Sequence, residues 1–274
     1  MLADDVRDFL HRHKVWLTKD LGQHFLTDDA VLGEILQAAK VKPGDNVLEI
    51  GPGIGILTRE LLRAGANVTA VELDERMLPL LKEFIGQELT ADRCSLIAVQ
   101  GNALHTPISI PPPYSVVANI PYAITSPLLR RLLLELPDLP TSLTLLIQRE
   151  VAETICAKTT EGILTALVGL CGKPTLIRHV PSVAFLPPPA VESSVLHIEC
   201  FKEPLADRDT IKRILKLVKH AMSGRRKMLR NTVGSLPDGM KALEETGIDP
   251  ERRPQTMHVE EWMKLERNID RDAR

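Results

Sequence analysis

Two segments of the sequence combine residue types and spacings suited to binding a nucleoside. Residues 49–55 read E-I-G-P-G-I-G, where an apolar strand pattern changes to a helical one. Glycine at such a turn lets the backbone bend tightly and approach a ligand. Glu72 ends the next strand pattern, 21 residues after Gly51, where a carboxylate accepts hydrogen bonds from a ribose in dinucleotide-binding folds. Each feature alone is typical of a tight turn or a solvated strand end, but together they predict a nucleoside site.

The spacing of the glycines narrows the class of nucleoside. The turn reads G-x-G-x-G, whereas the fingerprint of dinucleotide-binding folds is G-x-G-x-x-G, with a pyrophosphate on the helix N-terminus. S-adenosylmethionine carries an adenosine but no phosphate. We therefore expect S-adenosylmethionine as the cofactor in preference to NAD.

A second motif, N-I-P-Y, covers residues 119–122 and follows the apolar run S-V-V-A. The exocyclic amine of adenine is a poor nucleophile because its lone pair is delocalised into the ring. The Asn119 side-chain oxygen and the Ile120 carbonyl would hold its two hydrogens and direct the lone pair at a methyl donor. Tyr122 would stack on the base. In isolation N-P-Y is typical of a proline turn, but beside a nucleoside site it predicts methyl transfer by positioning and electrostatics.

These motifs require a scaffold in which strands and helices alternate. Apolar runs predict strands, and apolar residues at helical spacing predict the helices between them. The expected strands are 46–50, 68–71, 95–99, 115–118 and 142–147, and the expected helices are 28–40, 56–64, 75–85 and 127–135. This alternation predicts an α/β fold with a doubly wound, mostly parallel sheet, the Rossmann-like architecture of S-adenosylmethionine-dependent methyltransferases.

The pattern changes after about residue 174. Residues 174–201 are rich in proline and end in the strand pattern V-L-H-I-E-C-F, and helical patterns follow at 209–221, 225–232, 239–246 and 259–268. We therefore expect two domains. Residues 1–201 would bind the cofactor, with 1–27 contributing to the site, and residues 202–274 would form a small helical domain that docks RNA.

The net charge of −2 is unevenly distributed along the chain. Residues 208–230 hold nine Lys or Arg against the single Asp209. A concentrated basic segment can bind RNA phosphates without reading sequence, although charge runs are usually solvated helix faces. The residues that we expect to contact RNA are Arg225, Arg226, Lys227 and Arg230.

Composition excludes several classes of protein. Apolar residues make up 44% and charged residues 26% of the 274 residues, which is typical of a globular protein and not of a disordered chain. The four cysteines form no C-x-x-C pair, so we expect neither a metal site nor a disulfide framework. The N-terminus lacks the apolar core of a signal peptide, and residues 103–129, which include no Asp, Glu, Lys or Arg, contain six prolines. We expect a cytoplasmic protein without a membrane span.

Six segments together resemble the rRNA adenine dimethyltransferase family, and specifically its small-subunit branch, the kasugamycin-sensitivity methyltransferases. They are L-G-Q-H-F-L at 21–26, E-I-G-P-G-I-G at 49–55, A-V-E-L-D at 70–74, N-I-P-Y at 119–122, V-P-S-V-A-F-L-P-P-P-A-V-E-S-S-V at 180–195 and R-R-K-M-L-R-N at 225–231. The match extends over nearly the whole chain after residue 20. The combination is far more specific than any one of its motifs.

The resemblance implies dimethylation of the N6 amines of two adjacent adenosines near the 3′ end of small-subunit (16S) rRNA, with a role in small-subunit biogenesis. The implied partner is this rRNA or an immature small subunit, and we expect a monomer. Asn119 and Tyr122 would act on the target base, and Phe185 would stack on it opposite Tyr122. The implied cofactor contacts are His24, Leu26, Gly51, Glu72, Asn102 and Asn119.

Three positions depart from the family pattern. Asn102 replaces the usual Asp, so its hydrogen bond to the adenine amine of the cofactor would lose its charge-assisted part, and we expect weaker cofactor binding. Ala123 stands where the family often has Asn, and His24 stands where some relatives have Asn. None of these changes removes a group that carries the chemistry.

Three other functions stay open at this point. A large-subunit rRNA adenine dimethyltransferase of the macrolide-resistance type performs the same chemistry on a different RNA, although segment 180–195 and the helical tail are more similar to the small-subunit branch. A ribosome-assembly factor with weak or dispensable methylation would also bind immature small subunits. A DNA adenine methyltransferase shares the aromatic residue after N-I-P but is disfavoured by the flanking RNA-type motifs.

Overall fold

The computed structural model describes residues 2–15, 24–86, 95–224 and 226–269, which form two compact units. The first unit is Met1–Ala152 with Thr175–Cys200, and the second is Glu153–Pro174 with Phe201–Arg274. This division differs from the single boundary expected at 201/202, because α7 (Ile163–Cys171) packs on α8 (Arg208–Met222) and α10 (Val259–Asn268). Residues 153–174 therefore belong with the C-terminal helices.

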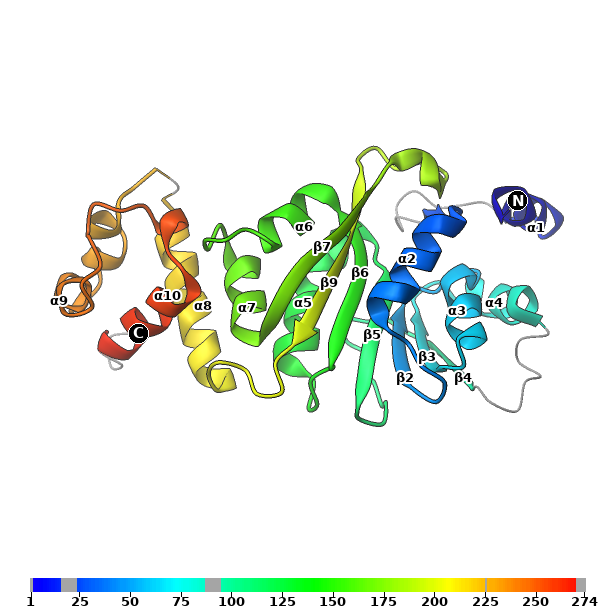
Figure 1. Ribbon diagram of the computed structural model, residues 1–274, viewed down its shortest axis with the longest axis horizontal. Coiled ribbons are helices and arrows are strands. Elements are labelled where there is room, and N and C mark those ends of the chain that lie inside the picture. The colour runs from blue at the N-terminus through cyan, green and yellow to red at the C-terminus, as the bar shows by residue number, and fades with distance from the viewer. Residues whose placement is uncertain (1, 16–23, 87–94, 225, 270–274) are drawn as a thin grey trace. The chain divides into compact units, whose positions relative to one another are not determined.

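A seven-stranded sheet forms the centre of the first unit (Figure 1). Its order is β4-β3-β2-β5-β6-β9-β7, in which β2 pairs in parallel with β3 and β5, β3 with β4, and β5 with β6, while β9 runs antiparallel to β6. The doubly wound, mostly parallel sheet is thus confirmed. The bounds are β2 Asn46–Ile50, β3 Asn67–Glu72, β4 Leu96–Gln100, β5 Tyr114–Asn119, β6 Ser142–Gln148, β7 Gly172–Val180 and β9 Ser193–Cys200.

The strand order reverses between β2 and β5, because the chain moves outward to β3 and β4 before it returns to the other side of β2. Ligands of open α/β sheets bind outside the carboxyl ends of the strands at such a point. The glycine turn follows β2, Glu72 ends β3 and Asn119 ends β5. The topology therefore gathers all three predicted features at one edge of the sheet.

Helices cover both faces of the sheet, with α2 (Asp29–Ala39), α3 (Ile56–Arg63) and α4 (Met77–Ile85) on one face and α5 (Thr125–Arg130) on the other (Figure 1). The side chain of Asp28 caps α2 by accepting hydrogen bonds from the backbone amides of Ala30 and Val31, which otherwise lack helical partners. The expected helix over 127–135 is α5 followed by a π-helical segment, Arg131–Glu135. Since both faces are covered, Val47, Leu48 and Ile50 of β2 are all buried.

Several elements were not predicted from the sequence. Helix α1 (Leu2–Arg12) buries an apolar face, and its Phe9 ring packs edge-on against Phe84 of α4. Strand β7, whose exposure alternates along its length, and helices α6 (Arg149–Ile155) and α7 occupy a region that the sequence analysis left unassigned or irregular. A two-stranded antiparallel sheet joins β1 (Phe25–Leu26) to β8 (Phe185–Leu186).

The second unit packs α7, α8, α9 (Gly239–Glu245) and α10 around a core that includes the fully buried Trp262. The helix expected over 225–232 is wrong for the described residues, of which only Leu229–Asn231 is helical, as a single 3-10 turn; a second 3-10 turn, Val233–Ser235, follows it. The backbone amides of Leu229 and Arg230 donate to the carbonyls of Arg252 and Pro250 instead of to carbonyls one helical turn earlier. Among the described residues, no helix is long and apolar enough to cross a membrane.

Candidate active site

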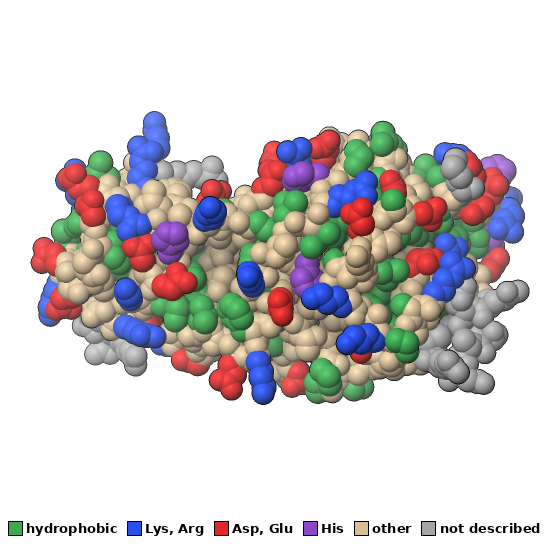
Figure 2. Space-filling model, in the orientation of Figure 1, with side chains coloured by type: hydrophobic (Ala, Val, Ile, Leu, Met, Phe, Trp, Pro, Cys, Tyr) green, Lys and Arg blue, Asp and Glu red, His purple; other side chains and the backbone are tan. Residues whose placement is uncertain are grey.

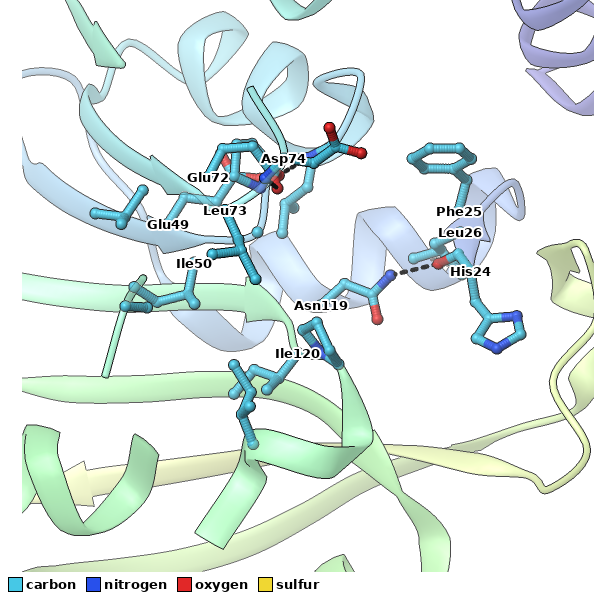
Figure 3. Close-up of a pocket in the computed structure, with 18 of the residues that line it drawn as sticks. His24, Phe25, Leu26, Glu49, Ile50, Glu72, Leu73, Asp74, Asn119 and Ile120 are labelled. Atoms are coloured by element: carbon cyan, nitrogen blue, oxygen red, sulfur yellow. Dashed lines mark hydrogen bonds between the residues drawn. The ribbon is translucent and has the colours of Figure 1, made fainter. Parts of the chain in front are cut away.

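A cavity of about 450 Å³ lies at the carboxyl ends of β2, β3 and β5 (Figure 3). Its volume is in the range of small-molecule and cofactor sites. The lining combines the glycine turn, the end of β3, the N-I-P-Y segment and residues 24–26 from the N-terminal part of the chain. Of the predicted site residues, it includes His24, Leu26, Gly51, Glu72, Asn102, Asn119 and Tyr122.

Two glycines of the turn adopt a backbone conformation that residues with a side chain rarely adopt. Gly53 has a φ of +57°, and a Cβ placed on it would lie 2.6 Å from Cε1 of Phe25. Gly51 has a φ of +66°, and its amide donates to the carbonyl of Val71 on β3. Both glycines are therefore required by backbone conformation. The turn leaves room at the cavity wall for a ligand to contact the main chain.

Glu72 holds the glycine turn as well as lining the cavity. Its Oε2 accepts from the Gly53 amide and its Oε1 from the Asp74 amide, each at 2.9 Å. Burial raises the pKa of Glu72, and these backbone hydrogen bonds oppose the shift. Each carboxylate oxygen has a second lone pair. The fixed carboxylate can therefore accept hydrogen bonds from a ribose, as its position at the end of β3 predicted.

Glu49 is a site residue that the sequence analysis did not identify. It lines the cavity, is 1% exposed, and accepts a hydrogen bond of 2.7 Å from the Thr58 hydroxyl. Burial raises its pKa to about 8, with a smaller contribution from the Glu72 charge and opposition from the Thr58 bond. The signal that could have identified it is an acidic residue inside the apolar strand N-V-L-E-I. Burying an ionisable side chain costs free energy, so such a residue in a buried strand indicates a functional or hydrogen-bonding role.

The side-chain oxygen of Asn102 accepts a hydrogen bond from a nearby backbone amide. Oδ1 accepts a hydrogen bond of 2.9 Å from the Leu104 amide, so the side chain closes the turn after β4. An amide oxygen has two lone pairs, and one of them is therefore already engaged. Asn102 still lines the cavity, in keeping with the expected contact to the cofactor.

The orientation of Asn119 is set by the N-terminal segment. Its Nδ2 donates to the backbone carbonyl of His24 at 2.9 Å (Figure 3). A carbonyl only accepts, so this contact assigns the amide nitrogen to His24 and leaves Oδ1 as the free acceptor of Asn119. The next residue, Ile120, is buried, and its amide donates to the carbonyl of Leu146 on β6. The backbone at the end of β5 is thus fixed.

Tyr122 is half-buried and held at its hydroxyl. That group forms a hydrogen bond of 2.7 Å with the hydroxyl of Ser193, which is fully buried at the start of β9. Burial raises the pKa of Tyr122 above its ordinary value, so the phenol stays neutral near pH 7. The Tyr122 ring is thereby held at the cavity wall, where stacking on a base requires it.

Phe185 lies elsewhere than the resemblance implied. It is 3% exposed, pairs with Leu26 between β8 and β1, and belongs to the apolar core with Phe25 and Val180. It is absent from the lining of the cavity. The described structure therefore does not bring Phe185 against Tyr122, and the aromatic ring that faces Tyr122 is that of His24.

The predicted RNA-binding residues differ in their surroundings. Arg225 lies outside the described residues. Arg226 and Lys227 are exposed, whereas Arg230 forms an ion pair with Glu251 at 2.8 Å. On α8, Arg213 pairs with the buried Glu266. On the face drawn in Figure 2, Lys and Arg side chains are interspersed with Asp and Glu side chains. The ion pairs of Arg213 and Arg230 show that part of the charge of the basic segment is balanced within the protein.

The set of donors and acceptors in the cavity fits S-adenosylmethionine. The positive-φ glycines expose main chain to a ligand, and the Glu72 carboxylate suits a ribose. Among the described residues, no group of His, Cys, Asp and Glu is arranged to hold a metal ion.

The sequence is similar to those of known rRNA methyltransferases, in agreement with a site for S-adenosylmethionine. A family model described as ribosomal RNA adenine dimethylase matches residues 16–271. The ribosomal RNA small subunit methyltransferase A of Novosphingobium aromaticivorans is 40% identical over 275 residues, which cover 96% of this chain and 96% of that protein. The protein of the same name from Dehalococcoides mccartyi is 38% identical, covering 96% of this chain and 92% of that protein.

The structure is also similar to solved structures of adenosine and rRNA methyltransferases. A dimethyladenosine transferase from Plasmodium falciparum superposes with a TM-score of 0.75 at 28% identity, covering 88% of this chain and 96% of the other. The 23S rRNA methyltransferase ErmE superposes with a TM-score of 0.68 at 27% identity, covering 90% and 100%. From the family match and the near full-length relatives, the chain belongs to the ribosomal RNA adenine dimethylase family.

Proposed function

We propose that this protein transfers methyl groups from S-adenosylmethionine to the N6 amines of two adjacent adenosines near the 3′ end of small-subunit rRNA. The product is N6,N6-dimethyladenosine, made during small-subunit biogenesis. The observation that carries the proposal is the orientation of Asn119, whose amide nitrogen is bound to the His24 carbonyl and whose oxygen is left to accept a hydrogen bond from the substrate.

The chain's own residues act by positioning. Asn119 Oδ1 and the Ile120 carbonyl hold the two hydrogens of the adenine amine, which favours a tetrahedral nitrogen with its lone pair available. S-adenosylmethionine supplies an electrophilic methyl group on a sulfonium. Tyr122, anchored by Ser193, holds the base in the plane that directs the nitrogen at that methyl. The amine loses its proton only after the transfer, so no general base is required before it.

The choice of the small subunit rests on the relatives. Those at 38% and 40% identity are named small-subunit methyltransferases, whereas the 23S rRNA methyltransferase ErmE is 27% identical. We take an immature small subunit as the partner and the cytoplasm as the compartment, with a monomer as the active form. The exposed Arg226 and Lys227 would contact phosphates without reading sequence.

The test is methyl transfer from labelled S-adenosylmethionine to small subunits that lack the modification. Parallel reactions contain large subunits, and the product nucleosides are identified by mass spectrometry. We expect dimethyladenosine in the small-subunit rRNA alone, and none with Asn119→Ala. Methylation of large subunits only would assign the chain to the macrolide-resistance type. Binding to small subunits without transfer would favour an assembly factor.

A further inference from the structure

Two buried carboxyl groups lie next to each other in the lining of the cavity. Glu49 and Glu72 belong to the neighbouring strands β2 and β3 and are 1% and 6% exposed. Glu49 lies opposite Ala70 in the parallel pairing of these strands. Glu72 is two residues beyond Ala70, and residues two apart in a strand point to the same face of the sheet. The two carboxyl groups are therefore neighbours on one face, at the end of the strands where the cavity lies (Figure 3).

The lining supplies little positive charge to balance these two groups. Among the described residues that line the cavity, none is Lys or Arg. Asp74, which follows β3 and is a third acidic residue of the lining, pairs with Arg76 at 2.6 Å. The lining residue that protonation would make positive is His24, and Figure 3 shows its imidazole pointing away from Glu72.

The other elements next to Glu49 do not change this balance. Helix α3 presents the Thr58 hydroxyl to Glu49, while its Arg59 and Glu60 pair with each other at 3.0 Å. Strand β5 ends in the neutral amide of Asn119. Two adjacent buried carboxyl groups in such surroundings cannot both be ionised without a large cost in free energy, so one of them keeps a proton.

The hydrogen-bond donors decide which of the two carboxyl groups keeps the proton. Glu72 accepts from two backbone amides, those of Gly53 and Asp74, and such bonds stabilise a carboxylate. Glu49 has a single donor in the described part of the chain, the Thr58 hydroxyl at 2.7 Å. In agreement with this difference, burial raises the pKa of Glu49 to about 8. Glu49 is therefore the neutral member of the pair at pH 7.

A cationic cofactor reverses the preference for the neutral form. S-adenosylmethionine carries a sulfonium and an ammonium group against one carboxylate, and so has one net positive charge. A positive charge in a buried cavity stabilises the ionised form of a carboxyl group in the same cavity. Glu49 is the lining carboxyl group that has a proton to lose.

We propose that binding of S-adenosylmethionine displaces the proton of Glu49, which leaves to solvent, and that the resulting carboxylate balances the charge of the cofactor. The cavity thus exchanges one positive charge for another. Because a proton is released, cofactor affinity should rise with pH up to about 8, where Glu49 is already ionised in the empty protein, and should then level off. The inference concerns the cofactor alone and does not depend on which RNA is methylated.

The experiment counts the protons released when the cofactor binds in the absence of RNA. S-adenosylmethionine is titrated calorimetrically into the protein at pH 7 in phosphate and in Tris, whose heats of ionisation differ, so the difference in binding enthalpy gives the number of protons. Glu49→Gln keeps the size of the side chain and an oxygen for the Thr58 hydroxyl, but it has no proton to lose. Glu75→Gln, which changes an exposed carboxyl group, is the matched control.

We expect the wild type and Glu75→Gln to release about 0.5 to 1 proton more per bound cofactor than Glu49→Gln. Between pH 6.5 and 7.5, the affinity of the wild type should accordingly rise about 3- to 10-fold more than that of Glu49→Gln. The comparison between variants cancels any proton that the amine of the cofactor itself loses.

Equal proton release and an equal pH dependence of affinity in the wild type and Glu49→Gln would overturn the inference. If Glu49→Gln does not fold, Thr58→Val replaces it. Loss of the hydroxyl removes the bond that lowers the pKa of Glu49, so the affinity of this variant should keep rising to a higher pH than that of the wild type, and an unchanged pH profile would count against the inference. Neither result affects the proposed methylation of small-subunit rRNA, which the transfer assay tests separately.

Discussion

The sheet edge and the C-terminal basic segment hold their ionisable side chains in opposite ways. At the sheet edge, Glu49 and Glu72 are buried, and each accepts hydrogen bonds from donors whose positions the fold fixes. In the basic segment, Arg226 and Lys227 are exposed, and Arg230 is paired with Glu251 on the surface. A buried side chain contributes through the exact position of its hydrogen-bonding atoms, whereas exposed cations contribute to RNA binding through their total charge. Substitutions should therefore have large, specific effects in the first region and small, salt-dependent effects in the second.

The largest effect is expected for Asn119→Ala. This substitution removes the acceptor for the adenine amine and the donor to the His24 carbonyl. Removal of one preorganised catalytic hydrogen-bonding group costs about 10²–10³ in kcat, and we expect at least that reduction in single-turnover methyl transfer. Cofactor affinity should change by less than tenfold. A variant that retains more than a tenth of the wild-type rate would contradict the role of Asn119.

Glu72→Gln tests the buried carboxylate at constant size. The amide cannot accept from both the Gly53 and Asp74 amides, which the carboxylate now does. Hydrogen bonds to charged groups contribute about 1.5–3 kcal/mol, so we expect S-adenosylmethionine to bind about 10- to 100-fold more weakly by calorimetry. Glu75→Gln, an exposed carboxylate three residues later, serves as the matched control. Equal affinities in the two variants would remove Glu72 from the cofactor site.

Glu49 predicts a pH dependence of stability. Its pKa is about 8 in the native protein against 4.5 ordinarily, so between these values the unfolded chain binds fewer protons than the folded one. Stability contributed by this group is therefore lost as pH rises from about 5 to 8. Between pH 6 and 8 the decrease is about 2 kcal/mol. The free energy of unfolding, measured in urea at several pH values, should fall less with rising pH for Glu49→Gln than for the wild type. An identical pH dependence in the two proteins would show that Glu49 is ionised in the native state.

The smallest effects belong to the basic segment. Replacing Arg226 and Lys227 by Gln should weaken subunit binding a few-fold and reduce the slope of log K against log salt by about one for each phosphate that the protein no longer neutralises. Arg230→Gln should do less, because the arginine is already paired with Glu251. An unchanged salt slope in the double variant would remove these residues from the RNA interface.

The sheet and the cofactor turn could be predicted because their signals are local. The strand N-V-L-E-I and the glycines that follow it are adjacent in sequence, and their pattern decides the local structure. The C-terminal turns could not be predicted in this way. Residues 229 and 230 carry a helix-compatible pattern, but their amides bind carbonyls of the 250–252 segment, and such tertiary partners override propensity.

Individual site residues could be predicted where a single residue at the end of a strand has a single role. Glu72 and Asn119 end strands and lie in the cavity as expected. The position of Phe185, in contrast, depends on the pairing of β8 with β1, where Phe185 lies opposite Leu26 and is buried. A one-residue change of register moves a side chain to the other face. The burial of Phe185 is therefore set by long-range pairing and has no local signature in the sequence.

The short sheet of β1 and β8 also sets the order in which the protein can become active during synthesis. His24 and Pro187, which it brings together, are 163 residues apart in the chain. A nascent chain that has reached Gln148 contains the glycine turn, Glu72 and Asn119, but not the strand that pairs with β1. Long-range strand pairing is slow because the entropy of closing the loop is lost before the contacts that stabilise the pair are formed. The contact between His24 and Pro187 can therefore form only after residue 187 has left the ribosome, later than the synthesis of the strands that carry Glu72 and Asn119.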